Sequence, residues 1–109
     1  MVNYEYQSLL CEICEKIHEV QDMQHNLMMK ILDDRNGGEG GLFGTVRGQN
    51  GTFDVESIYS QYDDNGNKVP MIHADYPSFE CDIEFDELTV SEKYQVLRDV
   101  IDELRKIES

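Results

Sequence analysis

Residues 79–86 read Phe-Glu-Cys-Asp-Ile-Glu-Phe-Asp, and this stretch decides the fold class. Apolar and acidic side chains alternate along it without interruption. Because successive side chains of a β-strand point to opposite faces, the pattern predicts a strand with one buried apolar face and one acidic face. Such a strand is typical of an antiparallel sheet that is covered on one side only.

Turn signals on the N-terminal side of this stretch divide the preceding chain into further strands. Asn50-Gly51 and Asn65-Gly66 favour tight hairpins, and Tyr76-Pro77-Ser78 offers a third turn. These signals predict an antiparallel meander with strands near 42–49, 52–62, 67–75 and 79–86. Pro70 weakens the third strand, or places that residue on an edge or near a bulge, because proline has no N–H to donate to a ladder.

Helical patterns flank the strands. Apolar residues recur every three or four positions from Tyr6 to Ile31, which predicts one helix of about eight turns. Such a helix would be about 40 Å long, more than a small sheet can cover, so the pattern predicts a homodimer through this helix. Thr89 and Glu92 form a capping box that starts a second helix. Its buried stripe is predicted to be Tyr94, Leu97, Val100, Ile101, Leu104 and Ile107.

The glycine-rich segment 36–44 separates the first helix from the strands. Too little chain lies on either side of it for two cores, so residues 1–109 are expected to form one domain with a flexible joint at 36–44. The expected fold class is α+β: a long N-terminal helix, a three- to four-stranded antiparallel meander, and a C-terminal helix packed on one sheet face.

The charge balance restricts the classes of partner. Twenty-three acidic and nine basic residues give a net charge of −14. Direct binding to nucleic acid or to an anionic membrane is disfavoured, because both require a cationic surface. No apolar run approaches the roughly 20 residues of a membrane-spanning helix, and no signal peptide is recognisable, so a cytoplasmic protein is expected. The three cysteines are odd in number and are expected to be reduced and mostly buried.

Metal binding by the first helix is an alternative that the spacing raises. Cys11, Cys14, Glu15 and His18 lie along one side, and Asp22 with His25 repeats the carboxylate-histidine spacing. A zinc knuckle would need a second cysteine pair, and Cys81 stands alone. No complete ligand set is apparent from one chain, so neither a metal nor a cofactor is expected.

Enzyme signatures are also incomplete. His73 is the one histidine among the predicted strands, and no Ser or Cys nucleophile stands beside it in a recognisable motif. The segment 63–67 lacks the frame of a calcium loop, and the segment 36–44 lacks the spacing of a phosphate-binding loop. The chain is therefore expected not to be an enzyme.

The acidic residues of the predicted sheet remain as the candidate site. Residues 52–88 contain ten acidic residues and a single lysine, Lys68. A protein-protein interaction through this face or through the long first helix, with a partner that can carry a basic surface, is the preferred hypothesis. The plainer explanation is that these acidic residues only keep an exposed sheet face soluble and protect an edge strand. The alternative is an inhibitor that imitates the phosphate backbone of a nucleic acid, as small acidic proteins of phages and mobile elements do. The candidate interaction residues are Asp54, Glu56, Asp75, Glu80, Asp82, Glu84 and Asp86.

Overall fold

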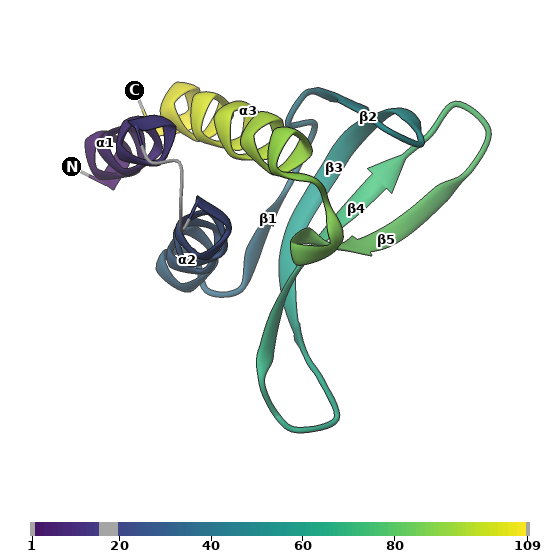
Figure 1. Ribbon diagram of the computed structural model, residues 1–109, viewed down its shortest axis with the longest axis horizontal. Helices are drawn as coiled ribbons and strands as arrows, with labels where there is room; N and C mark the ends of the chain where they lie inside the picture. The colour runs from purple at the N-terminus through teal and green to yellow at the C-terminus, as the bar shows by residue number, and fades with distance from the viewer. Residues whose placement is uncertain (1, 16–19, 109) are drawn as a thin grey trace.

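The computed structural model describes the backbone of residues 2–15 and 20–108, and the side chains of residues 5–13 and 20–106. It contains three α-helices and a five-stranded antiparallel sheet (Figure 1), which confirms the predicted α+β class. The elements in chain order are α1 (Val2–Glu15), α2 (Val20–Asp34), β1 (Gly38–Gly40), β2 (Thr45–Gly48), β3 (Gly51–Tyr62), β4 (Lys68–Asp75), β5 (Glu80–Glu84), the short 3-10 helix η1 (Phe85–Glu87) and α3 (Val90–Glu108).

Strand β3 organises the sheet. It pairs with β4 along one edge, and with β2 and then β1 along the other, while β5 pairs with the far side of β4. The predicted hairpins are present: Gly51 and Gly66 both have positive φ, and the Tyr76 N–H donates to the Phe79 carbonyl. Pro70 lies in β4 immediately before Met71, and Met71 is the first residue of β4 that pairs with β5. Its missing N–H therefore costs little there.

The described helices lie together on one side of the sheet (Figure 1). Helices α2 and α3 contact strands, and α1 packs on both of them. The apolar side chains of this layer and of the inner sheet face form one core, which includes Leu27, Ile31, Phe53, Val55, Ile58, Ile72, Phe85, Leu97, Val100, Ile101 and Leu104. None of the helices in the described part of the chain combines the length and apolarity that crossing a membrane requires.

The prediction of one long N-terminal helix is wrong. The structure has two helices, α1 and α2, which pack against each other and bury Leu10, Ile13 and Leu27. An apolar stripe of this spacing looks the same whether it packs on another copy or on the next helix of its own chain. Each helix is only about 20 Å long, so the excess length that suggested a homodimer is not present.

The segment 36–44 was expected to be a flexible joint, but part of it is strand β1. Gly38 pairs with Tyr59 and Gly40 pairs with Ser57, and the N–H of Phe43 donates to the Val55 carbonyl at 2.9 Å. Asn36 and Gly37, at the start of this segment, end helix α2. Both have positive φ, and the Gly37 N–H donates to the Leu32 carbonyl, as in a common helix C-cap.

The capping box at the start of α3 is confirmed. The N–H of Glu92 donates to the Thr89 hydroxyl at 3.1 Å, and the N–H of Thr89 donates to the Glu92 carboxylate at 2.8 Å. The same carboxylate also accepts the N–H of Gln49, in the turn between β2 and β3, at 3.3 Å. Glu92 therefore joins the start of α3 to the sheet.

We expect Glu92→Ala to lower the free energy of unfolding by about 1–3 kcal/mol, because it removes both acceptors from a buried position. Glu92→Gln should keep most of the stability, since glutamine also suits this position of a capping box. Urea denaturation measures both, with Asp102→Ala at an exposed position of α3 as control. Equal midpoints for Glu92→Ala and the control would contradict this role.

A buried tyrosine links the two N-terminal helices. The Tyr6 hydroxyl donates to the Asp34 carboxylate at 3.0 Å, and the ring is fully buried. Burial first, and then the hydrogen bond to Asp34, raises the pKa of Tyr6 to about 12 from its ordinary value of 10.

A raised pKa in the folded state makes the neutral phenol a source of stability. That contribution is complete below pH 10 and is lost as the pH rises to about 12. We expect Tyr6→Phe to be less stable than the wild type at pH 8, and the difference to shrink between pH 10 and pH 12. Urea midpoints of the two proteins across this range provide the test, and a difference that does not change with pH would contradict the assignment.

Candidate functional site

The sheet face opposite the helices carries six of the seven predicted interaction residues. Side chains of β3, β4 and β5 alternate between the core and this outer face, as their burial shows. We call it the acidic face and define it by Asp54, Glu56, His73, Asp75, Glu80, Asp82 and Glu84. The seventh predicted residue, Asp86, lies in η1, where its carboxylate is 2.7 Å from Nδ1 of His25 in α2.

A line of three carboxylates crosses the acidic face. Asp54 of β3 is directly opposite Asp75 of β4, and Asp75 is directly opposite Glu80 of β5. We call this line the carboxylate ladder. The Thr45 hydroxyl donates to Asp54 at 2.6 Å, and within the described side chains the one ion-pair partner of the ladder is His73, which reaches Glu80. Like charges directly opposite each other destabilise a sheet.

A β-bulge brings a fourth carboxylate to the centre of the face. Val55 pairs with Ala74 and Ser57 pairs with His73, so Glu56 is the extra residue between them. Bulges of this kind redirect a side chain and are common beside functional sites. Here the bulge places Glu56 next to His73, with carboxylate Oε2 and imidazole Nε2 3.5 Å apart.

His73 is surrounded by carboxylates from both neighbouring strands. Its Nδ1 lies 2.8 Å from Asp82 Oδ1, and its Nε2 lies 3.5 Å from Glu80 Oε1. The Tyr59 hydroxyl is a neighbour of the same Asp82, and burial followed by this carboxylate raises the pKa of Tyr59. Asp82 thus orients the imidazole, and Nε2 faces Glu56 and Glu80.

The pKa values at this centre follow from these contacts. The hydrogen bond to Asp82 raises the pKa of His73, and the bond to His73 followed by that to Tyr59 lowers the pKa of Asp82. Burial, and then the neighbouring Glu80, raises the pKa of Glu56. Ser57 lies across from His73, but no hydrogen bond joins the two among the described contacts. This is a histidine within a carboxylate cluster, without an aligned nucleophile.

Aromatic side chains flank the ladder. Phe79 was predicted to lie on the buried face of its strand, but it precedes β5 and is 56% exposed, which corrects that prediction. Its ring stacks on Tyr76 with centroids 4.6 Å apart, and Tyr76 contacts Phe53. A shallow cavity of about 220 Å³ lies between this aromatic group and the ladder, lined by Thr52, Phe53, Asp54, Asp75, Tyr76 and Pro77.

The metal alternative on the first helix falls largely outside the described residues. The side chains of Cys14, Glu15 and His18 are among those that the structure does not describe. Cys11 is exposed, so the expectation that it is buried is wrong, and Cys81 is a half-buried free thiol against the core. Among the described side chains, His25 is paired with Asp86, which is not a member of that set.

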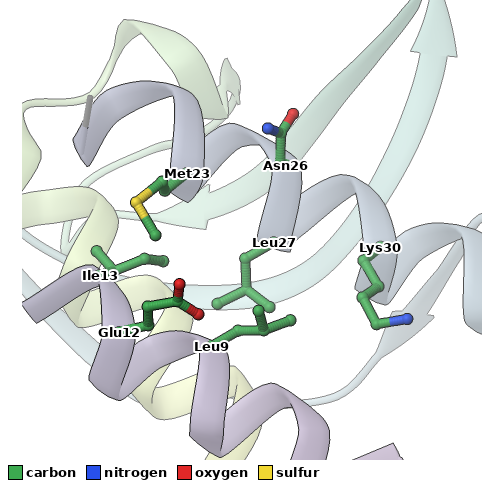
Figure 2. Close-up of a pocket in the computed structure, with 7 residues that line it drawn as sticks. All are labelled: Leu9, Glu12, Ile13, Met23, Asn26, Leu27 and Lys30. Atoms are coloured by element: carbon green, nitrogen blue, oxygen red, sulfur yellow. The ribbon is translucent and has the colours of Figure 1, made fainter. Parts of the chain in front are cut away.

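A second hollow lies between α1 and α2 (Figure 2). It has a volume of about 260 Å³ and is lined by Leu9, Glu12, Ile13, Met23, Asn26, Leu27 and Lys30. Its floor is apolar, and the Lys30 ammonium at one end bonds Glu5 at 3.2 Å. No set of reactive side chains converges on it within the described residues, so it offers less chemistry than the acidic face.

Sequence reasoning missed the arrangement around His73. The alternation of residues 79–86 places Glu80 and Asp82 on one face, but no local signal marks Glu56 as a bulge or pairs His73 with Asp82. The register between neighbouring strands brings these residues together, and the sequence of a single strand does not reveal that register. The chain matches no protein-family model, and neither a curated protein nor a solved structure is similar to it.

Proposed function

We propose that this protein is a cytoplasmic, non-enzymatic interaction module that binds a basic surface of a partner protein through its acidic face. The observation that carries the proposal is the carboxylate ladder. Asp54, Asp75 and Glu80 stand directly opposite one another on three adjacent strands, an arrangement that costs stability. Charge needed only for solubility would not have to be concentrated in this way.

The surroundings of the ladder suit a partner's arginine or lysine. A cation between the strands would relieve the repulsion, and the cavity beside Asp54 and Asp75 could receive its side chain. The stacked rings of Tyr76 and Phe79 add an apolar and cation-binding surface at the rim. Phe79 is an exposed aromatic side chain, and aromatic residues are enriched in protein interfaces.

The second candidate is mimicry of a nucleic acid, in which the partner's basic surface is one that normally binds phosphates. It is favoured by the row of Glu80, Asp82 and Glu84, which β5 presents with a spacing of about 6.8 Å. Competition separates the two candidates. If the partner's basic surface normally binds nucleic acid, a nucleic-acid duplex should displace the protein from it. If that surface does not bind nucleic acid, the duplex should leave the complex intact.

The experiment uses three forms of the protein as bait in a lysate of the native host. They are the wild type, the ladder variant Asp54→Asn/Asp75→Asn/Glu80→Gln, and the control variant Glu12→Gln/Asp64→Asn/Asp102→Asn. Both variants remove three carboxylates and change the net charge from −14 to −11, but only the first does so on the acidic face. A partner retained by the wild type and the control, and lost by the ladder variant, supports the proposal. Equal retention by all three contradicts it.

A further inference from the structure

We infer that Glu56, His73 and Glu80 form a binding site for a divalent transition-metal ion, for which Zn²⁺ is the best fit. The three side chains come from β3, β4 and β5, and one ligand atom of each lies within 4.8 Å of the others. One imidazole nitrogen and two carboxylate oxygens are donors that zinc accepts. Three protein ligands leave a fourth position open for water or for a group of a partner.

The distances are those of loose ion pairs, and they also fit a shared metal ion. His73 Nε2 lies 3.5 Å from Glu56 Oε2 and 3.5 Å from Glu80 Oε1, at the long limit for a hydrogen bond. Two ligand atoms on a tetrahedral zinc, each about 2.0–2.2 Å from the ion, are separated by about 3.4 Å. The observed separations therefore already match two edges of a zinc tetrahedron.

The other nitrogen of His73 is held as in known zinc sites. Nδ1 is 2.8 Å from the Asp82 carboxylate. A carboxylate in this position fixes the ring and directs the free electron pair of Nε2 towards the metal. His25 has a similar carboxylate partner in Asp86, but its Nε2 faces no pair of carboxylates among the described contacts.

The backbone fixes the third ligand. Glu56 is the bulged residue of β3, and its carbonyl accepts the N–H of Gly41 at 2.9 Å. The bulge turns Glu56 towards His73, where a regular strand would place only Ser57. All three ligands thus stand on paired strands, which is the kind of support that a precise metal site requires.

This inference is independent of the proposed function, because a metal site could serve any activity of the acidic face. It also differs from the sequence-based expectation that one chain offers no complete ligand set. That expectation rested on the first helix, and it did not include a set assembled across three strands.

Isothermal titration with Zn²⁺ into chelator-treated protein tests the site. We expect one ion per chain, and we expect His73→Ala, Glu56→Gln and Glu80→Gln each to weaken binding at least tenfold. Asp82→Asn should weaken it about ten- to a hundredfold without removing a ligand, as outer partners of zinc-bound histidines do. All four positions are at least partly exposed, so folded variants are expected, and circular dichroism checks this.

Two matched controls keep the result specific. His25→Ala removes the other described histidine-carboxylate pair and should leave Zn²⁺ affinity unchanged. Cys14→Ser/His18→Ala removes the alternative on the first helix and should also leave the affinity unchanged. The inference is overturned if the wild type binds no Zn²⁺ at millimolar concentration, if binding survives in His73→Ala, or if it is lost in Cys14→Ser/His18→Ala.

Thermal denaturation gives a second measurement that needs no assumption about activity. A ligand at about one hundred times its dissociation constant stabilises the folded state by about 2.7 kcal/mol, which corresponds to a rise in Tm of roughly 10 °C for a domain of this size. The rise should be present in the wild type and in His25→Ala, and absent in Glu80→Gln. An equal rise in Glu80→Gln would show that the ion binds elsewhere.

Discussion

Gly38→Ala is expected to destabilise the protein by about 2–4 kcal/mol, whereas Gly40→Ala is expected to change its stability by less than about 1 kcal/mol. Gly38 has a φ of 151°, and a Cβ there would collide with the backbone of Ile58 and would lie 2.8 Å from Cα of Tyr59. At Gly40 no atom lies within 4 Å of an added Cβ. Both glycines belong to β1, so the difference in stability between the two variants measures the effect of the close approach of Gly38 to β3.

Urea denaturation of the two variants decides whether the segment 36–44 is a strand or a joint. A flexible joint would tolerate either substitution, and both would then raise stability slightly by restricting the unfolded chain. Equal, small effects at positions 38 and 40 would therefore contradict the pairing of β1 with β3.

The ladder variant Asp54→Asn/Asp75→Asn/Glu80→Gln is expected to bind the partner at least tenfold more weakly than the wild type does. In chelator-treated protein its own stability should rise slightly, because the substitutions remove like charges that stand directly opposite each other. Loss of binding with a gain of stability is the signature of a functional surface, since damage to the fold would lower both. Titration calorimetry with the captured partner gives the affinity, and urea denaturation gives the stability.

The control variant Glu12→Gln/Asp64→Asn/Asp102→Asn makes the comparison specific. It has the same net charge as the ladder variant, so the long-range attraction between two oppositely charged proteins falls similarly in both. A control variant that loses as much affinity as the ladder variant would show that only overall charge matters.

Local signals predicted most of the fold. The turns at Asn50-Gly51 and Asn65-Gly66, the alternation in residues 79–86 and the capping box at Thr89 each depend on a few neighbouring residues. Such features are readable because the backbone conformation they require is determined by those same residues. The strands β2 to β5 and the start of α3 were therefore close to their predicted positions.

Features that depend on distant contacts were not predictable in this way. The chain between α1 and α2 contains no glycine or proline, and the apolar spacing continues through it, so the sequence favours a single helix. The alternative, in which Leu9 and Ile13 pack near Met23 and Leu27, is a matter of tertiary contacts (Figure 2). Strand β1 depends on glycines that fit only against the backbone of β3.

The candidate site shows the same division. Alternation placed Glu80, Asp82 and Glu84 on one face, and that face is the outer one. Asp86 was included because the alternation continues to it, but η1 begins at Phe85 and turns Asp86 towards His25. The bulge at Glu56 and the register that aligns His73 with Asp82 are set by pairing between strands, which one strand's sequence does not reveal.

The dependence of partner binding on salt tests the central proposal most directly. Salt shortens the screening length from about 10 Å at 0.1 M to about 3 Å at 1 M, and so weakens attraction between charged surfaces. We predict that the affinity of the wild type for the captured partner falls at least tenfold between about 0.05 M and 0.5 M salt, and that the ladder variant shows a clearly smaller slope. A wild-type affinity that is insensitive to salt, with equal slopes for the two proteins, would contradict binding through the acidic face.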